Sequence, residues 1–110
     1  MNAKVPARIR KIMKELKQGL VRIYGDKLKD LYLYGSYARG DYRQGSDVDV
    51  MILLSDYKNY WEEINRTSEL IQNVSLDHNI LVSRIFMTEE KWDRSDTPLF
   101  ENIHHDGQPA

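Results

Sequence analysis

The chain has 110 residues, of which 41% are hydrophobic and 30% are charged, and its formal net charge is −1. This composition is typical of a globular protein, and the length fits a single domain, residues 1–110, with one hydrophobic core. The absence of cysteine excludes disulfides and thiolate metal sites. No apolar run approaches the roughly 20 residues that cross a bilayer, and the start of the chain lacks the apolar core of a secretory signal, so we expect a cytoplasmic protein without membrane contact.

The first expected element is an amphipathic helix over residues 7–24. Apolar residues recur there at steps of three and four, with Lys and Arg between them, and Pro6 and Gly25 suit its two ends. Residues 1–29 contain nine Lys or Arg and two acids, whereas the rest of the chain contains seven and fifteen. The basic segment could face nucleic acid, an acidic partner or the acidic remainder of the fold. We prefer a solvated helix face, so nucleic-acid binding is not expected.

Two short strands are expected next. Residues 31–34 are β-prone and stop at Gly35, which indicates a tight turn. After a loop with glycine and serine, residues 47–54 form a second strand that is apolar in its second half and carries acids on alternate residues in its first. We expect these two strands to be neighbours in a sheet.

The remainder of the chain predicts one more strand and three more helices. A helix is expected from residue 57 to about residue 73, and a third strand over residues 79–87. A short helix follows Thr88, and a last helix of about two turns begins after Thr97 and ends at Gly107. The order helix, strand, strand, helix, strand, helix, helix predicts an α/β (α+β) fold with a small mixed β-sheet and helices packed on it.

Trp61, Trp92, His104 and His105 carry weaker signals. Tryptophans are more often buried in a core or an interface than stacked on a base, so burial is the expectation for both. The adjacent histidines diverge by about 100° on a helix and cannot easily share a metal. We interpret them as surface or helix-end residues.

Asp47 and Asp49 stand two residues apart at the start of the second strand. Residues two apart in a strand point to the same face, so the two carboxylates converge while Val48 and Val50 enter the core. Like charges beside buried apolar residues are poorly hydrated and repel each other. Mg²⁺ would offset both effects, because it prefers oxygen ligands and is commonly held by carboxylates plus substrate phosphates. Alone, such a pair more often consists of solvent-facing acids on an edge strand.

The residues before the acid pair favour a phosphate site. Gly35 lets the backbone turn sharply and lets a phosphate approach main-chain N–H groups, and the Ser36 hydroxyl adds a donor. A short helix that starts there would attract an anion, and Arg39 can pair with a phosphate or fix the loop through an acid. Tyr37 and Tyr42 lie in or near this loop and could meet the substrate. The strand, the Gly-Ser turn and the neighbouring Asp-x-Asp strand together predict a clamp for a metal and a triphosphate.

Residues 35–50, GSYARGDYRQGSDVDV, resemble the signature of the DNA polymerase β-like nucleotidyltransferase superfamily, specifically its minimal, MNT-type antitoxin branch. That signature is a Gly-Ser turn, a small residue, Arg and Gly, followed by Asp-x-Asp. The segment PLFENIHHDG is similar to the family's ending. The resemblance implies the polymerase β-like fold and transfer of a nucleotidyl group from an NTP, with Asp47 and Asp49 as catalytic residues and metal ligands. It also implies that Gly35 and Ser36 bind the triphosphate, and we expect Arg39 and Ser46 to contact the nucleotide as well.

The superfamily uses a third carboxylate on a later strand, as a metal ligand and as the base that activates the attacking hydroxyl. Similar minimal domains place an Asp at the position that aligns with Asn79, and an asparagine side chain cannot accept a proton. Asp77 lies two residues earlier, on the same face if the strand already runs there, whereas His78 points the other way. Asp77 is therefore the expected third catalytic residue and metal ligand. Without it, the domain would bind Mg-NTP and transfer poorly or not at all.

The expected activity is Mg²⁺-dependent transfer of a nucleoside monophosphate, AMP from ATP, to a hydroxyl on a protein partner. The resemblance implies that this partner is a helical HEPN protein encoded beside the chain, which would itself act as the MNT antitoxin. A second hypothesis is a catalytically weak or inactive antitoxin that neutralises a HEPN partner by binding. Modification of a small molecule is disfavoured, because the chain has no second domain to build an acceptor pocket. The oligomeric state stays open, a homo-oligomer included.

Overall fold

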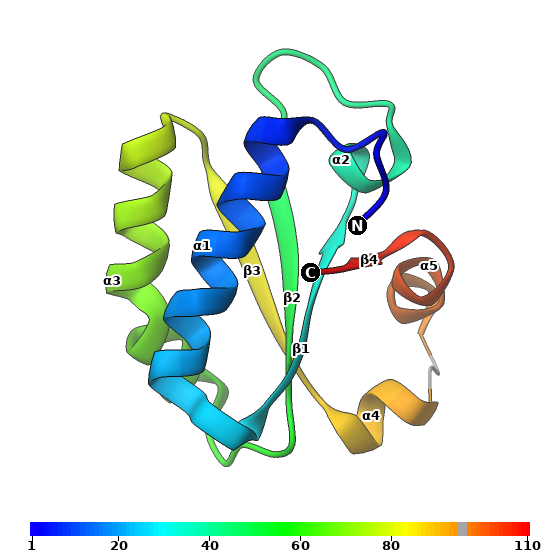
Figure 1. Ribbon diagram of the computed structural model, residues 1–110. Coiled ribbons are helices and arrows are strands. Elements are labelled where there is room, and N and C mark those ends of the chain that lie inside the picture. Colours follow the sequence, from blue (N-terminus) through cyan, green and yellow to red (C-terminus); the bar gives the residue numbers. More distant parts are fainter. Residues whose placement is uncertain (95–96) are drawn as a thin grey trace.

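The computed structural model describes residues 1–94 and 97–110. A four-stranded mixed sheet lies at its centre, with helices on both faces (Figure 1). The strands are ordered β3, β2, β1, β4 across the sheet, and β1 is antiparallel to β2 and β4, whereas β2 and β3 are parallel. Their bounds are β1 Leu28–Tyr34, β2 Val48–Leu54, β3 Val82–Thr88 and β4 Gln108–Pro109. None of the helices in the described ranges is long and apolar enough to span a membrane.

The two long helices, α1 Ala7–Tyr24 and α3 Tyr60–His78, cover one face of the sheet (Figure 1). Successive side chains of a strand point to opposite faces, so alternate strand residues meet these helices. The main core contains Leu33, Val50 and Phe86 from the three long strands, all buried against helical residues. The buried apolar positions of α1 follow the predicted three- and four-residue steps: Ile9, Ile12, Met13, Leu16 and Leu20.

The opposite face carries a smaller core under α4 Glu89–Arg94 and α5 Pro98–Asp106. Trp92 of α4 and Ile103 of α5 are both buried in this core. The rings of Trp92 and His104 stack with their centroids 3.4 Å apart, and His104 Nε2 lies 2.9 Å from the Trp92 carbonyl oxygen. These contacts join α5 to α4 and hold it over the sheet.

A polar network ties α3 to α1 and to β3. Tyr24 of α1 donates its hydroxyl to Glu63 Oε1 at 2.7 Å, and Arg66 Nε lies 3.1 Å from the same oxygen. Arg84 of β3 donates from Nε to Thr67 Oγ1 at 2.9 Å. Glu63 and Thr67 are buried, and a buried charge or hydroxyl needs partners of this kind to avoid a large desolvation penalty.

The predicted fold class and order of elements are confirmed, but several predicted boundaries are not. The strand predicted over residues 31–34 already begins at Leu28. The helix predicted over residues 57–73 begins at Tyr60, because the Asn59 side chain accepts the first N–H groups as a cap, and it continues to His78. The strand predicted over residues 79–87 begins only at Val82. The short pairing of β4 with β1 was not predicted either.

The tryptophans divide between core and surface. Trp92 is buried, as expected, whereas Trp61 is 72% exposed at the start of α3 and does not belong to the core of this chain. His104 and His105 are exposed on α5, as expected from their position near the helix end.

Replacing Tyr24 by Phe removes one hydrogen bond from the polar network and preserves the ring. Because buried Glu63 loses a donor, we expect the free energy of unfolding to fall by about 1–3 kcal/mol, measured by urea unfolding with circular dichroism. Tyr57→Phe is the matched control: its ring packs on the same core, and no hydrogen bond among the described residues uses its hydroxyl. The control should change stability by less than about 0.5 kcal/mol, and equal losses would contradict the role of the network.

Candidate active site

The end of β1 and the start of β2 lie side by side. In the antiparallel register the last residue of β1 pairs with Asp49, so the turn at Gly35 begins beside this carboxylate. Val48 and Val50 are fully buried in the main core, whereas Asp49 is half-buried on the other face. Asp47 directly precedes β2 and is exposed. The predicted separation of the acids from the two valines is therefore confirmed.

Gly35 is the point where the turn comes closest to the acid pair. Its backbone has φ 78° and ψ −157°, a conformation that residues with side chains rarely adopt. A Cβ atom at this position would lie 2.5 Å from Asp49 Oδ2, well inside van der Waals contact. Only glycine therefore lets the backbone turn here without displacing the carboxylate.

A single helical turn, α2 Ser36–Arg39, follows Gly35 directly. The Gly35 carbonyl accepts the N–H groups of Ala38 and Arg39, both at 3.1 Å. The first N–H groups of a helix have no partner within it, so those of α2 can serve an anion placed at the turn. At the other end of α2, Arg39 Nε lies 3.3 Å from Asp41 Oδ2, and both side chains are exposed. Of the two roles expected for Arg39, the structure therefore shows the pairing with an acid of the loop.

The acid pair is electrostatically unfavourable in the free chain. Burial raises the pKa of the Asp49 carboxyl, the nearby charge of Asp47 raises it further, and Arg39 lowers it in part. Tyr34 pairs with Asp49 across the strands, and burial together with Asp49 and Tyr60 raises the pKa of its hydroxyl to about 12. A hard divalent cation would remove the repulsion between the carboxylates, so this donor set fits the predicted magnesium.

Two cavities reach the acid pair. Asp49 lines a cavity of about 290 Å³ between the Gly35 turn and α5, which we call the Gly35 cavity. Asp47 lines a second cavity of about 490 Å³, which we call the Tyr42 cavity, and neither Gly35 nor Asp49 contributes to it. Each residue of the acid pair therefore lines a different cavity.

Leu99, Asn102 and Asp106 of α5 line the Gly35 cavity, and sequence reasoning missed all three. No local motif marks them, because they lie fifty or more residues from the acid pair. The one signal in the sequence is the family-like ending PLFENIHHDG, which the resemblance did not connect to the site. These residues give the Gly35 cavity a wall opposite the turn.

Ser46 organises the loop before the acid pair. Its Oγ accepts the Arg43 N–H at 2.8 Å, and its own N–H donates to the Arg43 carbonyl at 3.0 Å. Ser46 lines the Tyr42 cavity, whereas the other predicted nucleotide contacts, Gly35, Ser36 and Arg39, line the Gly35 cavity. A nucleotide contact by Ser46 stays a prediction.

The predicted third carboxylate, Asp77, does not lie on a strand. It occupies the last turn of α3, so the same-face argument that selected it does not hold. Asn79 follows as the left-handed cap of α3, also before β3 begins. The β3 residue beside Asp49 in the register is Ser83. Among the described residues, no three His, Cys, Asp or Glu side chains gather closely enough to hold a metal ion, so Asp77 does not complete a three-carboxylate site with the pair.

Asp49→Asn is expected to stabilise the fold at neutral pH. Because burial and Asp47 raise the pKa of Asp49 above its usual 3.8, the ionised carboxylate disfavours the folded state. This penalty is absent below pH 3.8, grows as the pH rises through that value, and is complete above the raised pKa. The variant lacks the penalty, so its free energy of unfolding should exceed that of the wild type at neutral pH by about 1 kcal/mol or less, since the group is partly solvated.

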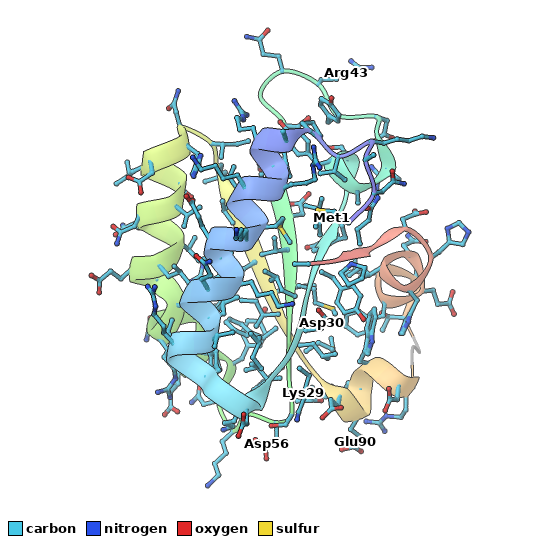
Figure 2. The ribbon with its side chains drawn as sticks, viewed as in Figure 1. Met1, Lys29, Asp30, Arg43, Asp56 and Glu90 are labelled. Carbon is cyan, nitrogen blue, oxygen red and sulfur yellow. The ribbon has the colours of Figure 1, made fainter. Side chains whose placement is uncertain are left out.

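Thermal unfolding of wild type and variant between acidic and neutral pH measures this difference. The gain should disappear as the pH falls to 3.8. Asp56→Asn is the control: Asp56 is exposed and lies at the end of the sheet opposite the loop that carries Arg43 (Figure 2). It should change stability by less than about 0.5 kcal/mol at any pH. A loss of stability in Asp49→Asn at neutral pH would contradict the unfavourable pair.

Comparison with known proteins identifies relatives over most of the chain. The model of the nucleotidyltransferase domain family matches residues 7–104. A candidate protein adenylyltransferase of Methanocaldococcus jannaschii is 42% identical over 74 residues, 67% of this chain and 74% of the relative. Another from the same organism is 30% identical over 84 residues, 76% of this chain and 78% of the relative.

Solved structures share the fold. A candidate nucleotidyltransferase from Sulfolobus solfataricus has a TM-score of 0.67 at 23% identity and covers 99% of this chain and 86% of its own. A toxin–antitoxin structure with AMP-PNP has a TM-score of 0.62 at 23% identity, and the match covers 88% of this chain and 70% of the matched chain. At this identity the likeness shows the nucleotidyltransferase fold, which confirms the fold expected from the sequence. With the family model matched over residues 7–104, the chain belongs to the nucleotidyltransferase domain family.

Proposed function

We propose that the chain transfers AMP from ATP, with Mg²⁺, to a hydroxyl group of a protein partner. The observation that carries this proposal is the contact of Asp49 with the Gly35 turn, with Asp47 two residues away at a second cavity. A turn that presents N–H groups suits phosphate oxygens, and an acid pair suits the cation that accompanies ATP. Membership of the nucleotidyltransferase family supports the same class of reaction.

In this proposal Gly35 and Ser36 bind the outer phosphates through main-chain N–H groups and the Ser36 hydroxyl, and Arg39 adds a positive charge. Asp47 and Asp49 hold Mg²⁺, which when bound neutralises charge that develops on the phosphate oxygens. The chain's own residues mainly position the α-phosphate and the leaving pyrophosphate, because phosphoryl-type transfers depend on positioning and electrostatics. The proton of the acceptor hydroxyl passes to water or to Asp47.

Two observations support a protein as the acceptor of AMP. The relatives from M. jannaschii are named as candidate protein adenylyltransferases, and the structural neighbour with AMP-PNP is a toxin–antitoxin structure. The resemblance to the MNT-type branch adds the identity of the partner, a helical HEPN protein, for which this chain would be the antitoxin.

A binding-only antitoxin is the second candidate function. The observation that favours it is Ser83, which stands beside Asp49 in the β2–β3 register. A serine hydroxyl supplies neither the charge of a third carboxylate nor a base of similar strength. In that case the chain would keep its affinity for Mg-ATP and mask the HEPN partner without modifying it.

Incubation of the chain with the HEPN protein encoded beside it, ATP and Mg²⁺, followed by intact mass of both proteins, separates the two functions. We expect an AMP adduct on the partner. In the double variant Asp47→Asn with Asp49→Asn, its rate of formation should fall by about 100-fold or more, because the variant loses the charges that hold Mg²⁺. Asp56→Asn, at the far end of the sheet, should keep the wild-type rate. A tight complex without an adduct would reject the transfer activity in favour of binding alone.

Gly35→Ala should weaken nucleotide binding in addition to its cost in stability. The new Cβ would press on Asp49 Oδ2 in a backbone with φ +78°, so the carboxylate must move away from the turn. Isothermal titration calorimetry should show Mg-ATP affinity lower by about 10-fold or more, alongside a stability loss of about 1–3 kcal/mol. Gly25→Ala is the matched control, because φ is +55° there but no atom lies within 4 Å of the added Cβ. It should lose stability and keep its affinity, and equal affinity in both variants would remove Gly35 from the site.

A further inference from the structure

We infer that the Tyr42 cavity is the acceptor site and that it receives a polypeptide segment in which acidic residues flank the hydroxyl. The inference rests on the proposed transfer of AMP and names the substrate class of that reaction. It assigns the acceptor to a space of about 490 Å³ that Asp47 lines and to which the Gly35–Ser36 turn does not contribute.

The two residues of the acid pair line different cavities, and this arrangement indicates the side from which the acceptor hydroxyl reaches the α-phosphate. Asp49 lines the Gly35 cavity together with the turn, and Asp47 lines the Tyr42 cavity. Displacement at phosphorus places the attacking and the leaving oxygen on opposite sides of the phosphorus atom. With the leaving pyrophosphate on the turn, an α-phosphate held at the acid pair is open to attack from the Tyr42 cavity.

The charge of the Tyr42 cavity favours acidic residues in the acceptor. Arg8 of α1 and Arg43 of the loop before β2 line the cavity, and Asp47 is the only acid among its lining residues. Arg43 lies on the loop at the end of the molecule away from Asp56 (Figure 2). Neither arginine forms an ion pair with another described residue, so both charges are open to a ligand. Complementary charge selects and orients a partner segment.

The walls of the Tyr42 cavity suit the side chains of a polypeptide. Tyr42 stacks on Tyr37 with ring centroids 4.6 Å apart and an interplanar angle of 21°. Because Tyr37 is buried in the main core, the exposed ring of Tyr42 has a fixed support. Ile80 and Leu81 add aliphatic surface, and Leu81 is 63% exposed. An apolar wall beside two arginines matches a segment that carries both apolar and acidic side chains.

The reaction at this site balances without a further reactant. The acceptor oxygen forms a bond to the α-phosphorus of ATP, while the bond from that phosphorus to the bridging oxygen breaks and pyrophosphate leaves with the electron pair. The hydroxyl proton passes to water or to the carboxylate of Asp47, which lines the cavity. The products are an AMP ester of the acceptor and pyrophosphate.

Amide chemical shifts of the full ¹⁵N-labelled chain test the acceptor site. AMP-PNP with Mg²⁺ is added first and should shift the signals of Gly35, Ser36 and Asp49. Two short peptides with a central tyrosine are then titrated, one flanked by glutamates and the other by lysines. The glutamate peptide should shift the signals of residues 42–47 and 79–81, because these segments line the Tyr42 cavity. The lysine peptide should leave them unchanged.

Two charge-reversal variants show whether the glutamate peptide binds at the Tyr42 cavity. Arg8→Glu with Arg43→Glu should weaken binding of the glutamate peptide by about 10-fold or more and preserve the AMP-PNP shifts. Lys14→Glu with Arg22→Glu reverses two exposed charges of α1 that line a different cavity. This control should change the affinity for the glutamate peptide by no more than about twofold, because screening confines charge effects to roughly 10 Å.

Three results would overturn the acceptor site. The first is equal binding of the two peptides, or binding of neither. The second is a set of peptide shifts confined to the outer face of α1. The third is a set of AMP-PNP shifts at Tyr42 and residues 79–81, which would assign the cavity to the nucleotide. Absence of AMP-PNP shifts at Gly35 and Ser36 would instead overturn the proposed function, so the two failures are distinguishable.

Discussion

The contact between Asp49 and Gly35 sets the geometry of the site. It follows from the pairing of β1 with β2, which places Tyr34 opposite Asp49 and leaves the next residue, Gly35, against the carboxylate. The core fixes this register, because a slip of one residue would move Val48 and Val50 out of the core and carry the acid into it. The apolar pattern of one strand therefore holds a carboxylate at the Gly35 turn.

This placement is unfavourable for the free chain, and the rest of the fold offsets it. Burial and the charge of Asp47 raise the pKa of Asp49, and Arg39 compensates only in part. Buried apolar cores on both faces of the sheet, and the hydrogen-bonded network around Glu63, supply stability at a distance from the site. A carboxylate that is partly buried beside a second carboxylate is characteristic of a functional site. A bound cation would remove the repulsion that the fold otherwise has to offset.

Local patterns predicted the order of the elements and placed the Gly35 turn beside the acid pair, but they failed at several element boundaries, of which the end of α3 matters most for the site. Gly35, Ser36 and the acid pair lie within one turn and one strand pairing, so strand periodicity and turn chemistry were sufficient. The assignment of Asp77 depended on where α3 ends. Asn79 adopts a left-handed conformation, and its N–H bonds to carbonyls of the preceding turn, including that of Leu76, so the helix extends past the position where the apolar run suggested a strand. Sequence period alone cannot separate a helix end from a strand start in a short apolar run.

The α5 wall of the Gly35 cavity, opposite the turn, depends on contacts between residues that are far apart in the sequence, which no local pattern predicts. Ile103 anchors α5 in the smaller core, β4 pairs with β1, and Gln108 Nε2 donates to the Ala38 carbonyl of α2 at 3.1 Å, across 70 residues of sequence. These contacts bring Asn102 and Asp106 to the Gly35 cavity. The turn is set by the strand register, whereas this wall exists only when the final helix is docked. A ligand that fills the space between them stabilises the docked helix, because whatever binds the assembled cavity also favours its assembly. If the Gly35 cavity binds the nucleotide, as in the proposed function, nucleotide binding and docking of α5 are linked equilibria.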